Sequence, residues 1–534
     1  MISSHGTHPL TEPEPAETDP WSIVLGHEQQ ASPTERKRRG AWYTPRSLVD
    51  ALVRLTFDGL DEAPELVLDP SCGGGGFLLG VLDRLVADGA SPEVALRRVA
   101  GIDIDASAIA AARRAIGAWA RGHDLPSSAV TGVRLGTADA LDGLPSAWPR
   151  PSIVIGNPPF ASPLRGGSFP ERAHEARRED GDLLGPYSDL AALHLLAAVR
   201  SCAPHGRVCL ILPQSLLAGR DSAGLRAWLD IAAPPTAVWI SSVGQFRASV
   251  NVWAPVLAVG GERGPVRVVA TSLPEPRSVA PGAWPELAAE ALGIPNPGID
   301  GDRAILFGTL ATATAGFRDE YYGIAAACRE SDDADRGALR IVTSGSLHPL
   351  SCSWGRKEIT LAKRRWSRPV ADRPAFDGAL GRWVEQQCRP KLVLPTQSRV
   401  FEPVIDTVGN LLPVTPVLSI NAQPEVLGRL AAVLLAPPVV AWAHRRWCGT
   451  ALSVGAMKLA AKDLALLPLP PSARQGTARR WDQAAELALG IDPFDVDATP
   501  LRETLETIGR LMTEAYGAPE SLFDWWSSRL HPVG

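Results

Sequence analysis

The sequence predicts an α/β protein: a doubly wound, mostly parallel sheet in the first half, followed by an α+β region and C-terminal helices. Short apolar runs alternate with helical patterns from residue 66 to about residue 260, which is typical of a parallel sheet covered by helices. From about residue 311 the alternation becomes irregular, and Trp and Arg become frequent. A chain of 534 residues has room for two or three domains with separate cores.

The elements of the sheet follow one another as strand, turn and helix. A basic cluster at residues 35–39 precedes a turn and a helix that begins near Arg46. A strand at residues 66–68 then leads through a glycine-rich turn into a helix, and this arrangement repeats from Val99. The remaining elements are a strand ending at Asp139, a strand ending at Asn157, helices at 189–203 and 216–230, and strands at 206–213, 237–242 and 252–259.

The composition is that of a globular protein in a reducing compartment. The net charge of −5 argues against a uniformly basic surface but not against a local basic face. The seven cysteines form no CxxC pair, so we expect neither a disulfide framework nor a metal. There is no secretory signal, and the longest apolar stretch, residues 430–443, is broken by two prolines and falls short of the roughly 18 residues of a membrane span. We therefore expect a cytoplasmic protein without a membrane partner.

A glycine-rich turn and three acidic strand ends indicate a nucleoside ligand. Glycines at 73–76 allow a sharp turn and a close approach of ligand to backbone N–H groups, although the G-x-G-x-x-G pattern is absent. Asp103, at the second strand end, can bind both hydroxyls of a ribose, and Asp139 can accept from an adenine amino group. Each aspartate alone could merely cap a helix. Aspartates at three successive strand ends, of which Asp69 is the first, instead favour a nucleoside ligand.

The same turn carries no group that would hold a phosphate. No Lys or Arg lies between Leu66 and Asp83. A nucleoside with a zwitterionic tail, such as S-adenosylmethionine, therefore fits better than a nucleotide.

The segment IVIGNPPF, residues 153–160, ends a buried strand with an unusual set of groups. Asn157 offers an amide, and the prolines after it fix the backbone and keep Asn157 extended. The amide oxygen and the Pro158 carbonyl can thus accept both hydrogens of one exocyclic amine, which frees its lone pair for attack. Phe160 supplies a face on which a flipped base can stack. A proline-terminated core strand is the alternative for this segment alone.

These motifs together carry a family resemblance. DPSCGGGGFLL, GIDID, TADAL and GNPPF, in this order, resemble the gamma-class N6-adenine-specific DNA methyltransferases of restriction–modification systems. GAWYTPRSLVD, residues 40–50, is similar to the segment that precedes the glycine turn in these enzymes. The motifs span residues 36–160 and, more loosely, reach about residue 260. The resemblance implies a Rossmann-like methyltransferase sheet, S-adenosylmethionine as cofactor and double-stranded DNA as partner.

The resemblance also implies roles for individual residues. Its pattern usually has Ser, Thr or Asn at the position of Gly74, and a second stacking residue that we place at Phe246. The target adenine would be held and stacked by the four residues Asn157, Pro158, Pro159 and Phe160. The cofactor would be bound at its methionine end by Tyr43, Thr44, Pro45, Asp69 and Gly73, at its ribose by Asp103, and at its adenine by Asp139 and Ala140. Further cofactor-binding candidates are Pro70, Gly75 and Ile104.

The second half has the composition of a nucleic-acid-binding face. Residues 340–399 hold twelve Arg and Lys but only four acids, with three interleaved Trp. The sharpest clusters are KRRW at 363–366 and HRRW at 444–447, so the candidate DNA-binding residues are Lys363, Arg364, Arg365, Arg445 and Arg446. A solvated charged surface is the alternative for any single arginine. The layout resembles the target recognition domain of Type I and Type IIG enzymes.

We therefore expect a flexible arm at 1–34, a methyltransferase domain at 35–300, a target recognition domain at 311–470 and a helical segment at 471–534. A restriction nuclease or defence-complex subunits are further partners that the resemblance suggests. Three alternatives remain: a protein glutamine N5-methyltransferase, an N4-cytosine enzyme, which usually has Ser in place of Asn157, and a catalytically silent DNA-binding subunit of a defence complex.

Overall fold

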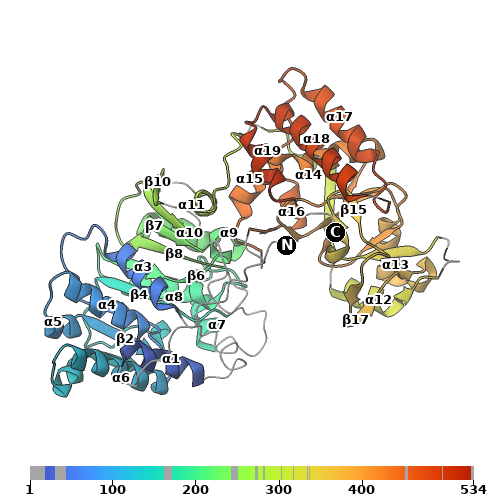
Figure 1. The fold of residues 1–534 in the computed structure, drawn as a ribbon. Helices are drawn as coiled ribbons and strands as arrows, with labels where there is room; N and C mark the ends of the chain where they lie inside the picture. Colours follow the sequence, from blue (N-terminus) through green and yellow to red (C-terminus); the bar gives the residue numbers. More distant parts are fainter. Residues whose placement is uncertain are drawn as a thin grey trace, which may run out of the picture. The chain divides into compact units, whose positions relative to one another are not determined.

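The protein, seen here in a computed structural model, divides into two compact units, Met1–Pro281 and Gly282–Gly534 (Figure 1). We call them the N-terminal unit and the C-terminal unit and describe each by itself. The structure describes residues 19–30, 44–161, 171–241, 251–270, 275–280, 283–301, 304–316, 318–332, 335, 337–451, 455–495 and 497–530.

The N-terminal unit is built on one large sheet. Its strand order is β10-β9-β7-β8-β5-β4-β1-β2-β3, with β6 paired to β8. The pairs from β5 to β3 are parallel, and β8 runs antiparallel to β5 and β7. The strands are β1 Val67–Asp69, β2 Val99–Asp103, β3 Arg134–Thr137, β4 Ile153–Gly156, β5 Arg207–Leu210, β6 Leu212–Pro213, β7 Pro235–Ile240, β8 Val252–Ala258, β9 Val266–Ala270 and β10 Arg277–Val279.

Helices cover this sheet. On one face, apolar side chains of α3, α4 and α6 share a core with the strands, because their buried positions recur at helical spacing. Helix α8 connects β4 to β5 and packs on β5 and β6. The helices are α1 Pro20–Gln30, α3 Arg46–Phe57, α4 Gly76–Ala87, α5 Pro92–Arg97, α6 Ala106–Gly122, α7 Glu171–Glu179, α8 Leu190–Ser201, α9 Ser215–Ala218 and α10 Ala223–Ala232, with 3₁₀ turns η1 Ser127–Gly132, η2 Ala140–Asp142 and η3 Arg220–Ser222.

The order of the strands creates a switch point between β1 and β4. From β1 the chain steps outward through β2 to β3 and then returns to place β4 against the other side of β1. In open α/β sheets, ligands bind outside the carboxyl ends of the strands at such a point. Asp69 ends β1, and Asn157 follows β4, so both predicted site residues flank it. The predicted α/β fold class is confirmed.

Two expectations for the N-terminal unit are corrected. Residues 20–30, expected as part of a flexible arm, form helix α1, whose first turn is capped by the Asp19 carboxylate through the N–H of Ser22. Val24 of this helix is buried in the core of the unit, which explains why the segment folds. The third strand ends at Thr137 rather than at Asp139, because the Asp139 side chain caps η2 instead.

The C-terminal unit contains two small four-stranded sheets and three two-stranded ones among its described residues. The larger sheets have the orders β11-β23-β19-β21 and β12-β18-β13-β22. The strands are β11 Ala311–Ala315, β12 Arg329–Glu330, β13 Leu339–Val342, β14 Leu347–His348, β15 Ser351–Cys352, β16 Ile359–Leu361, β17 Arg364–Trp366, β18 Pro369–Ala371, β19 Lys391–Pro395, β20 Gln397–Ser398, β21 Val404–Asp406, β22 Leu411–Pro413, β23 Val417–Ala422 and β24 Met457–Lys458.

The helices of this unit gather mainly around one core. Apolar residues of α14, α15, α18 and α19 share a cluster with strands β19 and β23. The helices are α11 Trp284–Ala291, α12 Arg318–Ala327, α13 Gly378–Gln387, α14 Leu427–Leu435, α15 Pro437–Trp447, α16 Ala461–Leu464, α17 Thr477–Leu489, α18 Ala498–Tyr516 and α19 Ser521–Ser527, with 3₁₀ turns η4 Phe307–Thr309, η5 Ser344–Ser346, η6 Arg373–Ala375 and η7 Pro424–Val426.

The packing differs from the expected domain boundaries in two places. Residues 283–300 were expected in the first domain, but α11 packs on α15 of the C-terminal unit. The segment 471–534 was expected as a separate element, but its helices share the core of α14 and α15. Among the described residues, no single helix meets the length and apolarity needed to cross a membrane, and the one pair that does so jointly, 424–435 with 437–447, is bent by 63°.

Candidate active site and nucleic-acid interface

The amide of Asn157 is tied to a residue far away in the sequence. Its Nδ2 donates a hydrogen bond to Oγ1 of Thr44 at 3.0 Å, across 113 positions of chain. Thr44 lies just before α3, and Asn157 directly follows β4. The TP segment and the NPPF segment, which were predicted to serve cofactor and target base respectively, therefore meet at one point. The hydrogen bond fixes the plane of the Asn157 amide.

The residues after Asn157 are held against the sheet. Pro158 is buried, and Phe160 is partly buried and packs on the core of the unit. The carbonyl of Ala161 accepts a hydrogen bond of 2.9 Å from the N–H of Leu190, the first residue of α8. The NPPF segment is therefore anchored at both ends, by Thr44 before the prolines and by α8 after Phe160.

Asp69 lies at the switch point in a strongly desolvated position. Its side chain is 2% exposed, and Oδ1 accepts a hydrogen bond of 3.0 Å from the N–H of Ser71. Burial raises the pKa of Asp69 to about 8, against the opposing effect of the Ser71 hydrogen bond. A Cβ on Gly156 would lie 2.3 Å from Oδ1 of Asp69. Glycine before Asn157 is thus what allows this carboxyl to lie beside the end of β4.

Asp103 ties the second strand end to the glycine turn. Its Oδ2 accepts from the N–H of Gly73 and its Oδ1 from the N–H of Asp105, both at 2.9 Å. Burial is the main reason why the pKa of Asp103 is raised, since these two hydrogen bonds lower it. Gly73 and Gly75 have φ values of 51° and 95°, which explains the glycines of the turn.

The remaining predicted cofactor residues lie around the same strand ends. Ile104 follows Asp103 and is 73% exposed, so it offers an apolar face to an aromatic ring. Asp139 accepts a hydrogen bond of 2.9 Å from the N–H of Leu141. Pro70 and Ala140 both line a cavity of about 520 Å³ between η2, α7 and α8. Pro45 precedes α3 directly after Thr44.

The donor set fits a nucleoside with a zwitterionic tail. A buried carboxyl at Asp69 can pair with an ammonium group, the carboxylate of Asp103 can accept from ribose hydroxyls, and exposed Ile104 can cover a base. Residues 66–83, which include the glycine-rich turn, contain no Lys or Arg. The turn therefore offers no cationic side chain that would favour a phosphate over this ligand. Two predicted residues, Tyr43 and Phe246, lie outside the described residues.

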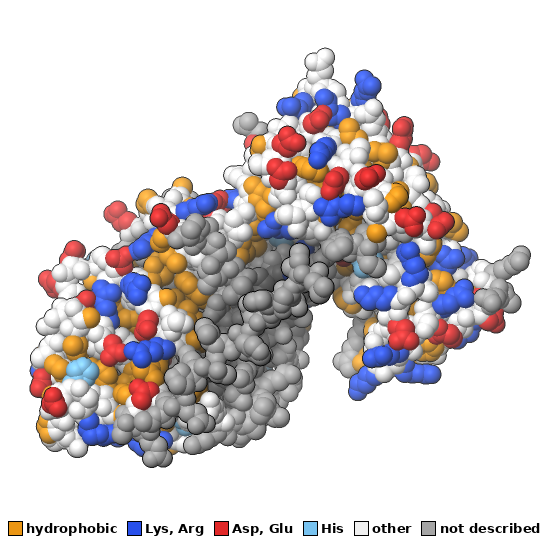
Figure 2. All heavy atoms as spheres, viewed as in Figure 1, with side chains coloured by type: hydrophobic (Ala, Val, Ile, Leu, Met, Phe, Trp, Pro, Cys, Tyr) orange, Lys and Arg blue, Asp and Glu red, His pale blue; other side chains and the backbone are white. Residues whose placement is uncertain are grey.

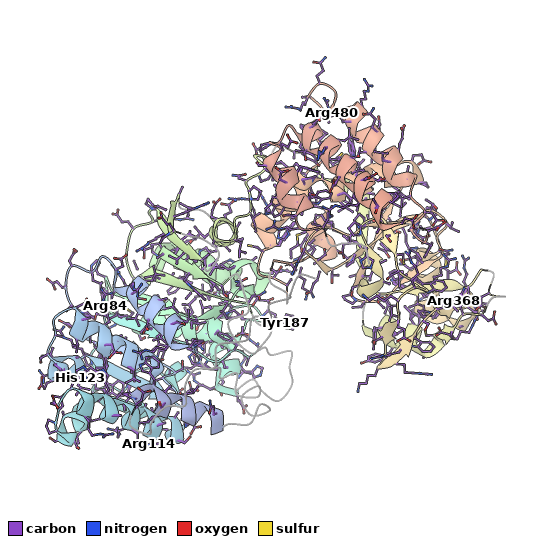
Figure 3. The ribbon with its side chains drawn as sticks, in the orientation of Figure 1. Arg84, Arg114, His123, Tyr187, Arg368 and Arg480 are labelled. Carbon is purple, nitrogen blue, oxygen red and sulfur yellow. The ribbon has the colours of Figure 1, made fainter. Side chains whose placement is uncertain are left out.

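Sequence reasoning missed an exposed aromatic residue near the NPPF segment. Tyr187 is 58% exposed and lies three positions before Leu190, whose N–H binds Ala161 (Figure 3). Its own N–H donates to the carboxylate of Asp221, at 3.3 Å. A lone tyrosine ahead of a helix carries no distinctive sequence signal, so only the fold reveals this position.

The first predicted DNA-binding cluster forms the tip of a hairpin. Strands β16 and β17 pair antiparallel, and Lys363, Arg364 and Arg365 are exposed at and after the turn. Ala362 and Lys363 both have positive φ, at 49° and 64°, as a type I′ turn requires. Glycine or asparagine normally occupies such positions, so the turn is strained. Figure 2 shows Lys and Arg side chains gathered at this end of the C-terminal unit.

Hydrogen bonds brace the hairpin at its tip and at its base. The N–H of Ala362 donates to Oη of Tyr321 at 2.9 Å. At the base, Oε1 of Glu330 accepts from the N–H of Ser367 and of Arg368, at 3.0 and 2.6 Å. The guanidinium of Arg364 lies over the ring of Trp366, 4.8 Å from its centre. The basic side chains are therefore presented by a fixed backbone.

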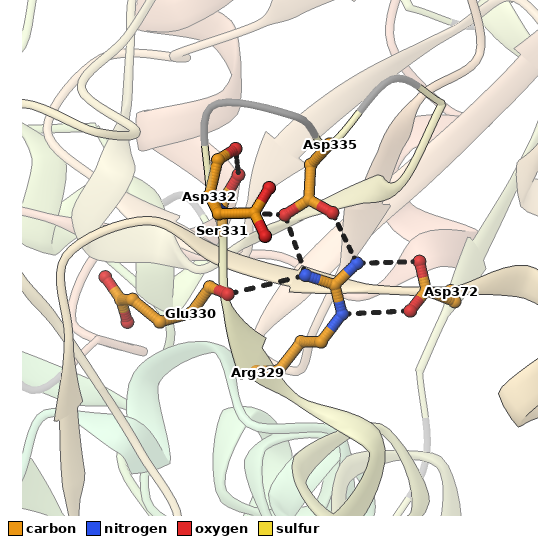
Figure 4. Close-up of polar contacts among 6 residues, drawn as sticks. All are labelled: Arg329, Glu330, Ser331, Asp332, Asp335 and Asp372. Carbon is orange, nitrogen blue, oxygen red and sulfur yellow. Dashed lines mark hydrogen bonds and ion pairs between the residues drawn. The ribbon is translucent and has the colours of Figure 1, made fainter.

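A surface ion-pair network supports the strand that carries Glu330. Arg329 forms paired hydrogen bonds with the carboxylates of Asp335 and Asp372, at distances of 2.6 to 2.9 Å (Figure 4). The guanidinium of Arg329 holds the pKa of both carboxyls below their usual range. Because β12 pairs with β18, the network connects the base of the hairpin to the sheet.

The second predicted cluster is corrected in part. Arg445 is buried, 7% exposed, and its guanidinium bonds to the carboxylate of Glu290 at 2.7 Å and the carbonyl of Ile294 at 2.9 Å. Arg445 links α15 to α11, and its guanidinium is too buried to contact a DNA phosphate. Arg446 is half-buried and stacks on the ring of Trp442, 3.7 Å from its centre. Arg445 is therefore a structural residue.

Asp69 and Asn157 flank the switch point, and Asp103 ends the neighbouring strand β2, so the predicted site residues lie at one edge of the sheet. Residues 28–226 match the family described as N-6 DNA Methylase. The predicted resemblance to the N6-adenine methylases of restriction–modification systems is confirmed.

Solved structures with a similar fold cover most of the chain. The Type IIL restriction–modification enzyme MmeI, in complex with DNA, has a TM-score of 0.62 at 14% identity over 97% of this chain and 80% of its own. The DrdV–DNA complex has a TM-score of 0.53 at 12% identity, covering 88% and 59%. A nuclease-deletion mutant of the Type ISP enzyme LlaGI, with a DNA substrate mimic, has a TM-score of 0.52 at 11% identity, covering 84% and 47%. At these identities the likeness shows the fold alone.

Proposed function

We propose that this chain is a site-specific DNA methyltransferase of a restriction–modification or phage-defence system. It transfers a methyl group from S-adenosylmethionine to N6 of an adenine that is flipped out of duplex DNA. The observation that carries this proposal is the hydrogen bond between Thr44 and Asn157, since it joins the predicted cofactor segment to the predicted base-holding segment.

The chemistry assigned to the chain is positioning and hydrogen-bond acceptance. The cofactor supplies a methyl group on a positively charged sulfur. The amide oxygen of Asn157 and the carbonyl of Pro158 accept the two hydrogens of the adenine amine, so that its lone pair attacks the methyl carbon. The C–S bond breaks, its electron pair stays on sulfur, and the methylated nitrogen loses one proton to solvent. Phe160 stacks on the extruded base.

The C-terminal unit is the proposed DNA reader. The exposed side chains of Lys363, Arg364 and Arg365 sit on a braced hairpin, and Arg and Lys contacts to phosphates dominate the affinity of such proteins for DNA. A target recognition role for this unit also accounts for the site preference that a site-specific methyltransferase needs.

The test is methyl transfer by the purified full-length protein. With radiolabelled S-adenosylmethionine, duplex DNA of mixed sequence should become labelled, and nuclease digestion should release the label as N6-methyladenine. A glutamine-containing release-factor-like peptide and label at N4 of cytosine are the competing products. Label on the peptide alone, or on cytosine alone, would overturn the assignment to adenine, and DNA binding without any label would indicate a silent subunit.

A further inference from the structure

Helix α1 covers the glycine-rich turn of the proposed cofactor site. It packs along α6 and against α4, the helices that begin just beyond Asp103 and the turn (Figure 1). Val24 is 2% exposed, and a Cβ on Gly74 would lie 3.2 Å from the Cα of Val24 and 3.4 Å from its Cγ1. A side chain at position 74 would therefore press on the backbone of α1, which would have to shift by a few tenths of an ångström.

This contact explains a departure in the sequence of the turn. The resembled family usually has Ser, Thr or Asn where this chain has Gly74, and the side chain of such a residue would press on Val24. The family match begins at residue 28, so most of α1 lies outside it. Trp21 adds a second contact. Its ring would lie 3.7 Å from a Cβ added at Gly76, and the centre of the ring lies 5.1 Å from the Arg46 guanidinium.

We propose that α1 is a cap on the cofactor site, which clamps the glycine turn through Val24. Its ligand is a nucleoside with a charged amino-acid tail, so this inference rests on the proposed function. We expect the cap to slow the release of the cofactor and of its demethylated product, S-adenosylhomocysteine.

The test uses S-adenosylhomocysteine binding to the full-length protein, measured by calorimetry. Gly74→Ser should weaken binding about tenfold, because the added side chain displaces α1. Serine is the residue type usual at this position, so the turn itself tolerates it. Gly132→Ser is the matched control, since a Cβ there meets nothing within 4 Å, and it should bind normally. Far-UV circular dichroism should be the same for all variants.

Two further measurements separate a cap from a general loss of structure. Gly74→Ser and Val24→Asp each detach the same helix, so their effects on binding should not add. The double variant should bind S-adenosylhomocysteine no more weakly than the weaker of the two single variants. In the unchanged protein, amide hydrogens of residues 20–27 should exchange more slowly once the ligand is bound.

The outcomes distinguish this inference from the proposed function. If the unchanged protein binds S-adenosylhomocysteine but Gly74→Ser binds equally well and exchange at 20–27 does not respond, the cap is refuted and the methyltransferase proposal stands. If the unchanged protein does not bind the compound at all, the proposed cofactor is wrong, and the cap fails with it.

Discussion

The Asn157 amide donates a hydrogen bond of 3.0 Å to the Thr44 hydroxyl, which joins the end of the fourth strand to the segment before α3. This contact orients the amide with its nitrogen toward the TP segment. In the proposed reaction the amide oxygen must face the adenine amine, and an unrestrained amide could present either end. Thr44 is therefore expected to act through Asn157, as a positioning residue.

Replacing the Thr44 hydroxyl should slow catalysis more than it weakens binding. Thr44→Val keeps the shape of the side chain but removes the acceptor, so the Asn157 amide loses its fixed orientation. We expect kcat to fall by roughly 100-fold, the cost typical of a misplaced catalytic group. Thr44→Ser, which keeps the hydroxyl, should retain most of the activity. Steady-state methylation kinetics of the two variants would measure this, and equal activity of Thr44→Val would contradict it.

The buried carboxyl of Asp69 should make cofactor binding depend on pH. Its pKa is raised to about 8 by burial, so the free protein carries a proton there at neutral pH. Pairing with the cofactor's ammonium group requires the ionised form. The affinity for S-adenosylhomocysteine should therefore rise by up to about tenfold per pH unit between about pH 6 and pH 8. Asp69→Asn should bind weakly and without this slope.

The same carboxyl should affect the stability of the ligand-free protein. Because the pKa of Asp69 is higher in the folded protein than its ordinary value of 3.8, its contribution to stability is full below about pH 4 and is lost as pH rises toward 8. Asp69→Asn should thus gain stability relative to the unchanged protein as pH rises across this range. Urea unfolding at several pH values would show it; a constant difference would argue against a protonated Asp69.

A side chain added at Gly156, beside Asp69, should disturb the proposed cofactor site without unfolding the protein. A Cβ on Gly156 would lie 2.3 Å from the Asp69 carboxylate, so Gly156→Ala should displace that group and weaken cofactor binding. Gly136→Ala, on β3, is the matched control, because its Cβ would make only ordinary contacts with Trp148 at 3.7 Å. Calorimetric titration should separate the two variants. Normal cofactor affinity of Gly156→Ala would place the ligand elsewhere.

The braced hairpin should govern the salt dependence of DNA binding. Replacing Lys363, Arg364 and Arg365 by Gln should weaken binding and reduce the slope of log K against log salt by about 0.9 for each phosphate that these side chains neutralise. Arg445→Gln should instead lower the thermal stability, since it leaves Glu290 without its partner, and should keep the salt slope. An unchanged slope for the triple variant would remove the hairpin from the DNA-binding surface.

The parts of this site that could be predicted from the sequence are those encoded by short local patterns. The glycine turn, the aspartates that end β1 and β2, and the NPPF segment are local patterns, so their places at the switch point could be predicted from strand and helix alternation. The hydrogen bond between Thr44 and Asn157 joins residues that are 113 positions apart, so no local sequence pattern predicts it.

Two errors show where local patterns fail. Arg364 and Arg445 lie in nearly identical clusters, KRRW and HRRW, yet the first is exposed and the second is buried against Glu290. Residues 20–30 are flanked by prolines and polar residues, but Val24 and Trp21 find apolar partners on the glycine turn. In both cases a residue distant in the sequence decides the outcome.

The most direct test of the account is to read the DNA of cells that make the protein. The full-length chain and its Asn157→Ala variant would be expressed in a host without adenine methylases, and the DNA analysed by mass spectrometry and single-molecule sequencing. The unchanged chain should produce N6-methyladenine within one sequence context, and the variant should produce none. Equal methylation by the variant, or N6-methyladenine absent from both, would contradict it.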